Sequence, residues 1–271
     1  MAYQNLQYDV DNHIATITLN RPQVLNALST NLKNEIRAAL AEAAVDYSVR
    51  VVIIRGAGRA FSAGYDVRGD EYPAERSVKK YAPRLQDDLE FTMAPFDHPK
   101  PVIAQIHGYC MGGALEFALM CDLRFASDDT IFGVVETRFA DGVATMIHPW
   151  IIGPSRAKDL IFSGRRVTAR EALEMGLINR VTTGERLEEE THRYATVLAK
   201  IAPEALIWNK KAVNGAMEIM GLRGALAHGL QACIALDSSE TEMGREFYAR
   251  ARRDGLTAAI RWRDAEFEDT Q

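Results

Sequence analysis

The sequence is short of cysteine, of basic charge and of long apolar runs. Its three cysteines are an odd number without C-x-x-C spacing, so we expect neither a disulfide framework nor a cysteine-based metal site. The formal net charge of −5 argues against a general affinity for nucleic acid, because phosphate binding needs a basic face. Nowhere do about 18 uncharged apolar residues follow one another, and the first residues lack a signal-peptide pattern, so we expect no membrane span and a cytoplasmic protein.

The 271 residues, 47% of them hydrophobic, allow one large domain, or one domain with a small appendage. In the first two thirds of the chain, strand patterns alternate with helical patterns. Strands are predicted over 15–19, 50–55, 101–106, 123–126 and 131–134, and helices over 32–43, 77–93 and 108–122. This alternation is typical of an α/β core with largely parallel strands.

After about residue 183 the strand patterns stop. Helical patterns continue to the end of the chain, with breaks near Pro203, Gly221, Asp237 and Gly255. We therefore divide the chain into an α/β core over residues 1–195 and a helical region over residues 196–271.

Two glycine turns each follow a predicted strand. The first contains Ala63-Gly64-Tyr65-Asp66, and the second, Gly112-Gly113, opens a helix. Glycine permits positive φ and close approach of a ligand, and the free N–H groups at a helix start favour negative charge. Two such turns from neighbouring strands could aim two N–H groups at one point, as an oxyanion hole requires. They could equally be ordinary strand-to-helix turns.

Two glutamates stand in apolar surroundings. Glu116 lies one turn inside the helix that Gly113 opens, among side chains that leave almost no polar face, so we predict that it lines a cavity instead of facing water. Glu136 ends an apolar strand twenty residues later. Two carboxylates around one pocket could divide acid and base work, because burial and mutual repulsion push their pKa values apart.

Taken together, six segments in this order resemble the crotonase family, also called the enoyl-CoA hydratase/isomerase family. The similarity covers most of the chain, through residues 19–28, 61–66, 101–104, 108–122, 132–136 and 168–179. The resemblance implies a crotonase-like spiral of strand-strand-helix (ββα) units, with a C-terminal helical region that builds homotrimers, often paired into hexamers. It also implies an acyl-CoA substrate, no metal and no separate cofactor, since coenzyme A is part of the substrate.

The resemblance implies roles for particular residues. The thioester carbonyl is held by N–H groups that correspond to Tyr65 and Gly113, and the two glutamates that act on water in family hydratases correspond to Glu116 and Glu136. The similarity therefore favours an enoyl-CoA hydratase of fatty-acid or aromatic-acid degradation, with Glu136 as the acid at C2 and Glu116 as the base for water. The remaining substrate-binding positions are Ala63, Gly64, Asp66, Arg68, Gly112 and Asp141.

Other functions stay open on the same residues. Family isomerases commonly keep the second glutamate without the first. Double-bond isomerisation, dehydration of a hydroxyacyl-CoA and C–C hydrolysis of a β-diketone are alternatives within the family. A catalytically silent paralogue that binds acyl-CoA or RNA belongs to a different class, and the paired glutamates argue against it.

The segment 137–150 departs from the glycine-rich sequence that follows the second glutamate in many hydratases. It carries a third carboxylate, Asp141, which could take part in chemistry or cap a helix. Tyr65 replaces a small residue, and its ring could narrow the pocket or stack on it. Arg68 lies where relatives have a basic residue near CoA, and it could instead be solvated.

Overall fold

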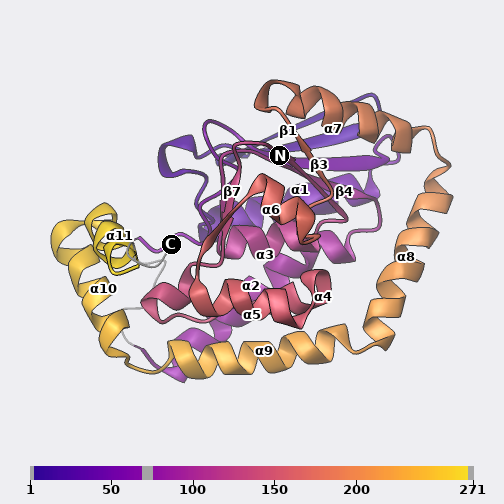
Figure 1. Cartoon of the computed structure of the whole chain (residues 1–271). Coiled ribbons are helices and arrows are strands. Elements are labelled where there is room, and N and C mark those ends of the chain that lie inside the picture. The colour runs from indigo at the N-terminus through magenta and orange to yellow at the C-terminus, as the bar shows by residue number, and fades with distance from the viewer. Residues whose placement is uncertain (1–2, 69–75, 268–271) are drawn as a thin grey trace.

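A six-stranded sheet is the larger of two sheets in the computed structural model, which describes residues 3–68 and 76–267; it lies in the upper part of Figure 1. Its first two strands are antiparallel, and the others run parallel to the second. In spatial order the strands are β1 (Leu6–Asp11), β2 (Ile14–Leu19), β3 (Val51–Gly56), β4 (Val102–Ile106), β6 (Leu123–Ser127) and β9 (Arg180–Thr182). The predicted α/β class with largely parallel strands is confirmed.

Strand β3 is apolar over its first four residues, 51–54, because helices cover both faces of the sheet there. Val52 and Ile54 point to one face, which packs against α1 (Thr30–Val45), α2 (Val78–Asp97) and α3 (Gly113–Met120). Val51 and Ile53 point to the other face, which packs against α7 (Gly184–Ala199). Side chains alternate along a strand, so a strand buried on both faces reads as a continuous apolar run.

A second, three-stranded sheet carries the glycine turn of residues 112–113. Its strands are β5 (Tyr109–Met111), β7 (Ile131–Gly133) and β8 (Arg166–Thr168). The helix predicted over 108–122 is therefore wrong at its start, because residues 109–111 pair with β7 and the helix α3 begins only at Gly113. Pairing with a distant strand overrode the local apolar pattern, which cannot distinguish a buried strand from a buried helix.

The rest of the chain is helical. Two 3-10 turns, η1 (Pro22–Val24) and η3 (Glu136–Phe139), and three short helices, α4 (His148–Ile152), α5 (Pro154–Ser163) and α6 (Ala169–Glu174), complete the core. Four helices follow: α8 (Pro203–Ile219), α9 (Leu222–Asp237), α10 (Glu242–Asp254) and α11 (Leu256–Ala265). The four predicted breaks match their ends, whereas the boundary predicted after residue 195 falls inside α7, which packs on the sheet.

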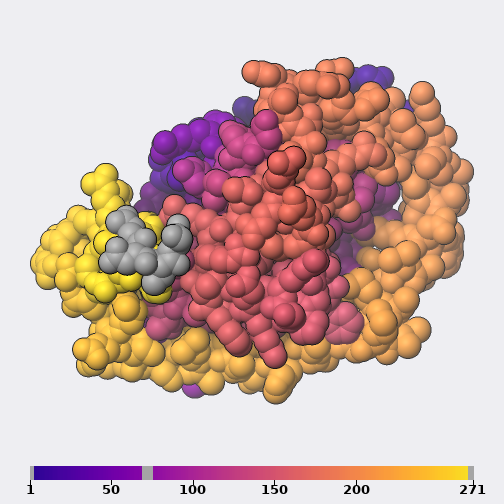
Figure 2. Space-filling model, in the orientation of Figure 1, coloured from indigo at the N-terminus to yellow at the C-terminus, as the bar shows by residue number. Residues whose placement is uncertain are grey.

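These four helices wrap one side of the molecule. Figure 1 shows α8 at one end, α9 passing beneath the body, and α10 and α11 at the other end, where they form a distinct lobe in Figure 2. No residue of α8 is buried in the chain as described, while α9 packs on α2, and α10 packs on η3. No single described helix is long and apolar enough to cross a membrane. Taken together, α8 and α9 are long and apolar enough to do so by length and composition alone, although the chain bends by 58° between them.

The three cysteines, Cys110, Cys121 and Cys233, are buried and free of disulfide bonds, as predicted. Among the described residues, no group of three or more His, Cys, Asp or Glu side chains could hold a metal ion.

Candidate active site

Backbone pairing between the turn after β3 and strand β5 brings the two glycine turns together. The N–H of Ser62 donates to the carbonyl of Tyr109 at 3.0 Å, and the N–H of Met111 donates to the carbonyl of Ser62 at 3.2 Å. Gly64 has a φ of +95°, and a Cβ on it would lie 2.8 Å from the carbonyl oxygen of Met111 and 3.5 Å from the nitrogen of Gly113. Only glycine allows this conformation and this approach.

In the part of the chain that the structure describes, the N–H groups of Tyr65 and Gly113 have no hydrogen-bond partner. The carbonyl of Gly64 accepts from Leu28, whose own carbonyl accepts from Asp66, so that the N–H of Tyr65 between them points the other way. The N–H of Gly113 stands at the start of α3, where helix geometry supplies no acceptor. Within residues 3–68 and 76–267, neither N–H donates to a protein oxygen.

The side chain of Tyr65 fixes the spacing of the two turns. Its ring lies directly on Gly113, where a Cβ would be 2.1 Å from the ring atom Cε2. The Tyr65 hydroxyl lies 3.2 Å from the hydroxyl of Thr92 and 3.4 Å from the carbonyl oxygen of Asp88, both on α2. The ring is thereby held between the two glycine turns and α2, and it forms part of the cavity wall.

Glu116 is buried in the first turn of α3, with 1% of its surface exposed. Its Oε2 accepts a hydrogen bond from the N–H of Thr145 at 2.9 Å. Burial, and then the charge of Glu136, raise its pKa well above the usual range, while the hydrogen bond from Thr145 opposes the rise. The prediction that this glutamate does not face water is confirmed.

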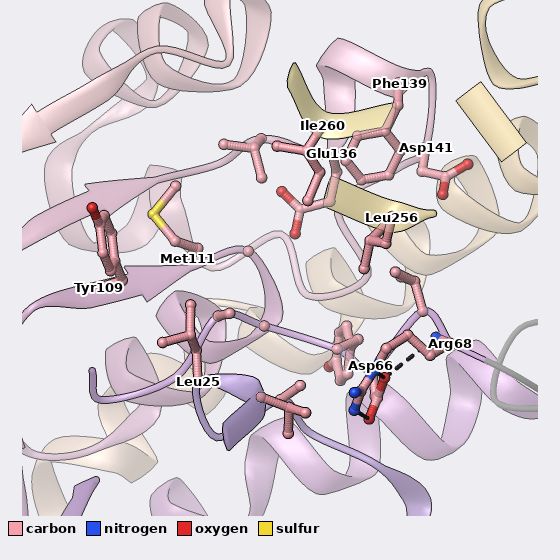
Figure 3. Close-up of a pocket in the computed structure, with 18 of the residues that line it drawn as sticks. Leu25, Asp66, Arg68, Tyr109, Met111, Glu136, Phe139, Asp141, Leu256 and Ile260 are labelled. Carbon is pink, nitrogen blue, oxygen red and sulfur yellow. Dashed lines mark hydrogen bonds and ion pairs between the residues drawn. The ribbon is translucent and has the colours of Figure 1, made fainter. Parts of the chain in front are cut away.

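Glu136 opens the turn η3 directly after β7, and its carboxylate lies against the second glycine turn. A Cβ on Gly112, which has a φ of +54°, would be 2.3 Å from Oε1 of Glu136. The other oxygen, Oε2, is buried and has no hydrogen-bond partner among the described residues. Burial raises the pKa of Glu136 to about 7, and nearby Asp141 acts in the same direction. Figure 3 shows this carboxylate pointing into the cavity between Met111 and Leu256.

One cavity of about 510 Å³ unites the predicted site. Its walls are otherwise largely apolar, as is usual for small-molecule sites. Of the predicted residues, all but Gly113 line it: Ala63, Gly64, Tyr65, Asp66, Arg68, Gly112, Glu116, Glu136 and Asp141. Gly113 itself lies against the ring of Tyr65. Residues from Ala63 to Asp141, which include both glycine turns and both glutamates, are thus brought to one cavity.

Asp66 anchors one edge of this cavity. Arg68 donates to it through Nε at 2.8 Å and Nη2 at 2.6 Å, and Arg21 donates to it at 3.0 Å. Burial would raise the pKa of Asp66, but the hydrogen bonds from Arg68 and Arg21 outweigh burial and lower it. Arg68 remains 43% exposed at its side chain, so it presents positive charge at the cavity edge while Asp66 holds it in place (Figure 3).

Asp141 is not a helix cap, contrary to one of the two predicted roles. The next helix, α4, begins at His148, and no side chain caps it. Asp141 is instead buried on the cavity wall, where Arg76 pairs with it at 2.8 Å and the hydroxyl of Tyr248 donates to it. An ion pair with a residue 65 positions earlier cannot be read from the local sequence.

The last two helices contribute a wall of the cavity that the sequence analysis did not assign to the site. The residues involved are Phe247 of α10 and Leu256, Thr257, Ile260 and Arg263 of α11. The break at Gly255, with a φ of +89°, turns the chain back so that α11 lies beside α10. The sequence did contain an indication of this wall, because Leu256, Ala259 and Ile260 recur at helical spacing, with Arg263 on the same face. Such spacing predicts that a helix face is buried, but it does not show which part of the protein covers that face.

Comparisons with known proteins agree with this geometry. The sequence model of the enoyl-CoA hydratase/isomerase family matches residues 9–255. A crystal structure of an enoyl-CoA hydratase/isomerase from Xanthobacter autotrophicus Py2 superposes with a TM-score of 0.95 and 40% identity, over 98% of this chain and 99% of that one.

Two curated relatives extend the comparison. A probable enoyl-CoA hydratase of Rhizobium meliloti is 32% identical over 99% of both chains. The probable enoyl-CoA hydratase echA8 of Mycobacterium bovis is 34% identical over 80% of this chain and 84% of its own length. The predicted crotonase-like fold is therefore confirmed.

Proposed function

Because this chain belongs to the enoyl-CoA hydratase/isomerase family, we propose that it adds water across the 2,3 double bond of a 2-enoyl-CoA thioester. The relatives support an acyl-CoA reaction of this family. One observation carries the choice of hydration, namely two carboxylates on a single cavity: Glu116 is buried, and Glu136 is partly exposed but has a buried Oε2. Hydration needs a base for the water and an acid for C2, whereas shifting a double bond needs only one group that carries a proton.

The two free N–H groups would hold the thioester carbonyl. Hydrogen bonds from Tyr65 and Gly113 would polarise the carbonyl, make C3 electrophilic and stabilise the enolate that forms when water attacks. Glu116 would take the proton of the attacking water, the oxygen would bond to C3, and Glu136 would deliver a proton to C2. No separate cofactor enters this scheme, since coenzyme A is part of the substrate.

The hydrogen bonding of the two glutamates supports this division of roles. The N–H of Thr145 donates to Glu116 and lowers its pKa, so it opposes the rise that burial and the charge of Glu136 cause, and it favours the charged form that a base needs. Oε2 of Glu136 is buried without a partner among the described residues, and the pKa of this carboxyl is raised to about 7 by burial. Such an environment favours the protonated form, which is the form an acid needs.

A direct test is to incubate the protein with crotonyl-CoA and with 2-enoyl-CoAs that carry longer and aromatic acyl groups. We expect at least one of them to gain the mass of one water, with the label at C3 when the reaction runs in ¹⁸O-enriched water. A product of unchanged mass with a shifted double bond would instead support isomerisation.

We also propose that the protein assembles into a trimer or hexamer. Helix α8 exposes several large apolar side chains, including Trp208 (63%), Val213 (64%) and Ile219 (90%), an unusual density for a surface that faces only water. We expect light scattering to give the mass of a trimer or hexamer at micromolar concentration, and Val213→Glu to lower it. Val45→Glu, at a 75% exposed valine on α1, is the matched control and should not change the mass. A stable monomer would contradict the proposal.

A further inference from the structure

A single loop connects the surroundings of the two glutamates. Residues 136–145, here called the carboxylate loop, begin with Glu136 and end with Thr145, whose N–H donates to Glu116. The carbonyl of Glu136 accepts from the N–H of Asp141 at 3.1 Å, which closes the first half of the loop. A displacement of the carboxylate loop would therefore disturb both carboxylates at once.

Helix α9 holds the middle of the carboxylate loop at Gly142. The N–H of Gly142 donates to Oδ1 of Asp237 at 2.6 Å. A Cβ on Gly142 would lie 2.8 Å from the Sγ and 2.9 Å from the Cα of Cys233. Cys233 and Asp237 are four residues apart and so share a face of α9. The loop thus rests on the helix backbone and is fixed there by one hydrogen bond.

Asp237 is a buried carboxylate with few compensating charges. It is 1% exposed, lines the cavity, and forms no ion pair within the described part of the chain. Asp141 faces it from the carboxylate loop, and Arg84 faces it from α2. Arg76, just before α2, reaches its backbone carbonyl at 3.3 Å. Burial and then Asp141 raise the pKa of Asp237 to about 7, against the opposing effect of Arg84 and Arg76.

The remaining titratable neighbours come from α9 itself and from other elements. Tyr81 of α2 and Cys233 of α9 also lie within the electrostatic range of Asp237. Glu136 is influenced by Asp237 and Asp141, which both raise its pKa, and by Arg263 of α11, which lowers it. Glu116 faces Glu136 from α3. The charge of Asp237 therefore acts on the proposed acid without touching the substrate-polarising turns.

We infer that Asp237 is a positioning residue with two separable effects: its carboxylate fixes the carboxylate loop through Gly142, and its negative charge keeps a proton on the Glu116–Glu136 pair. The inference deepens the proposed hydration and rests on it. Loop geometry depends on an acceptor oxygen at this position, whereas proton retention depends on charge, so two substitutions separate them.

Asp237→Ala removes the acceptor and the charge together. We expect kcat/KM for crotonyl-CoA, or for whichever 2-enoyl-CoA the wild type hydrates, to fall by about 10–10²-fold, the scale of a small misplacement of catalytic groups. Hydrogen–deuterium exchange in peptides covering the carboxylate loop should become faster.

Asp237→Asn keeps an acceptor oxygen for Gly142 but loses the charge. We expect its kcat/KM to be about tenfold higher than that of Asp237→Ala. Hydrogen–deuterium exchange in its carboxylate loop should match that of the wild type. The high-pH limb of its kcat/KM profile should move to lower pH by about half a unit to one unit. The sign follows because Asp237 is ionised above pH 7, where its charge opposes loss of the last proton from the glutamate pair.

Asp122→Asn is the matched control. Asp122 also accepts a backbone N–H, that of Val102 at 2.7 Å, and is partly buried beside Lys210, but it does not line the cavity. Its asparagine variant should keep the wild-type pH profile and the wild-type exchange in the carboxylate loop. If Asp237→Ala does not fold, Asp237→Asn still tests the charge, and its loop exchange still tests the acceptor.

The outcomes separate this inference from the proposed function. If the wild type hydrates no 2-enoyl-CoA, the proposed function fails, while loop exchange and a ¹³C-carboxyl titration of Glu136 still report on Asp237. Unchanged loop exchange in Asp237→Ala overturns the geometric effect. An unmoved pH limb and an unmoved Glu136 titration in Asp237→Asn overturn the electrostatic effect.

Discussion

Replacing Glu136 or Glu116 by glutamine is expected to lower kcat for 2-enoyl-CoA hydration by roughly 10²–10⁴-fold, the contribution of a well-placed general acid or base. Glutamine keeps the size of each side chain and an acceptor oxygen, so that the N–H of Thr145 can still donate at position 116. What it removes is the titratable proton. Steady-state rates with crotonyl-CoA, alongside circular dichroism spectra to verify folding, measure the effect.

The double variant and one neighbouring variant identify which chemistry is at work. If the two glutamates act as a unit, the double variant should be scarcely slower than either single one, because residues that cooperate in one step fail together. Loss with Glu136→Gln alone would favour single-carboxylate isomerisation. Asp141→Asn serves as the comparison on the same wall; loss of a different acyl-CoA activity in it, with no hydration in the wild type, would contradict the hydratase proposal.

The burial of Glu116 could be predicted because its surroundings are local. Apart from Glu116, residues 114–120 are apolar and lie in a single helix, so the sequence predicts that no face of this helix meets water. The two glycine turns could also be predicted, and Gly64 and Gly112 do adopt the positive φ that glycine permits. Features set by one turn of chain, such as these, can be read from the chain.

The role of Asp141 and the extent of β5 could not be read in this way, because distant partners decide them. Asp141 is held by Arg76 and Tyr248, which lie 65 residues before it and 107 residues after it. Residues 109–111 form a strand only because β7 pairs with them. In both cases the local sequence was compatible with two structures, and a contact with residues far along the chain determines which of them forms.

The C-terminal wall of the cavity shows the same limit at a larger scale. The sequence predicted helices with breaks near Pro203, Gly221, Asp237 and Gly255, and these were confirmed. The sequence interpretation assigned these helices to assembly and named none of their residues for the site, whereas α10 and α11 also line the cavity of the same chain. Amphipathic spacing predicts that a helix buries one face, but the path of the chain decides what that face meets.

Gly113→Ala is expected to lower kcat by about 10²-fold or more, although it keeps the N–H that would bind the thioester oxygen. The new Cβ would be 2.1 Å from Cε2 and 2.5 Å from Cδ2 of the Tyr65 ring. That ring has little freedom to retreat, because its hydroxyl lies at Thr92 and Asp88, and Lys33 lies 5.8 Å from its centroid. The backbone of the two glycine turns must shift instead, and this displaces the N–H groups of Tyr65 and Gly113. Loss of one such donor costs about 10²–10³-fold.

Removing the ring tests this explanation. Tyr65→Ala leaves the N–H at position 65 and opens room for the new methyl group, so adding Gly113→Ala to it should cost far less than the same change costs in the wild type. The difference between the two costs is the coupling energy of the ring and the glycine. Gly224→Ala, at a glycine of α9 with nothing within 4 Å of its Cβ position, is the matched control and should leave kcat unchanged. Wild-type turnover in a folded Gly113→Ala variant would mean that the two turns tolerate a shift, and hence that no fixed pair of donors at Tyr65 and Gly113 drives the reaction.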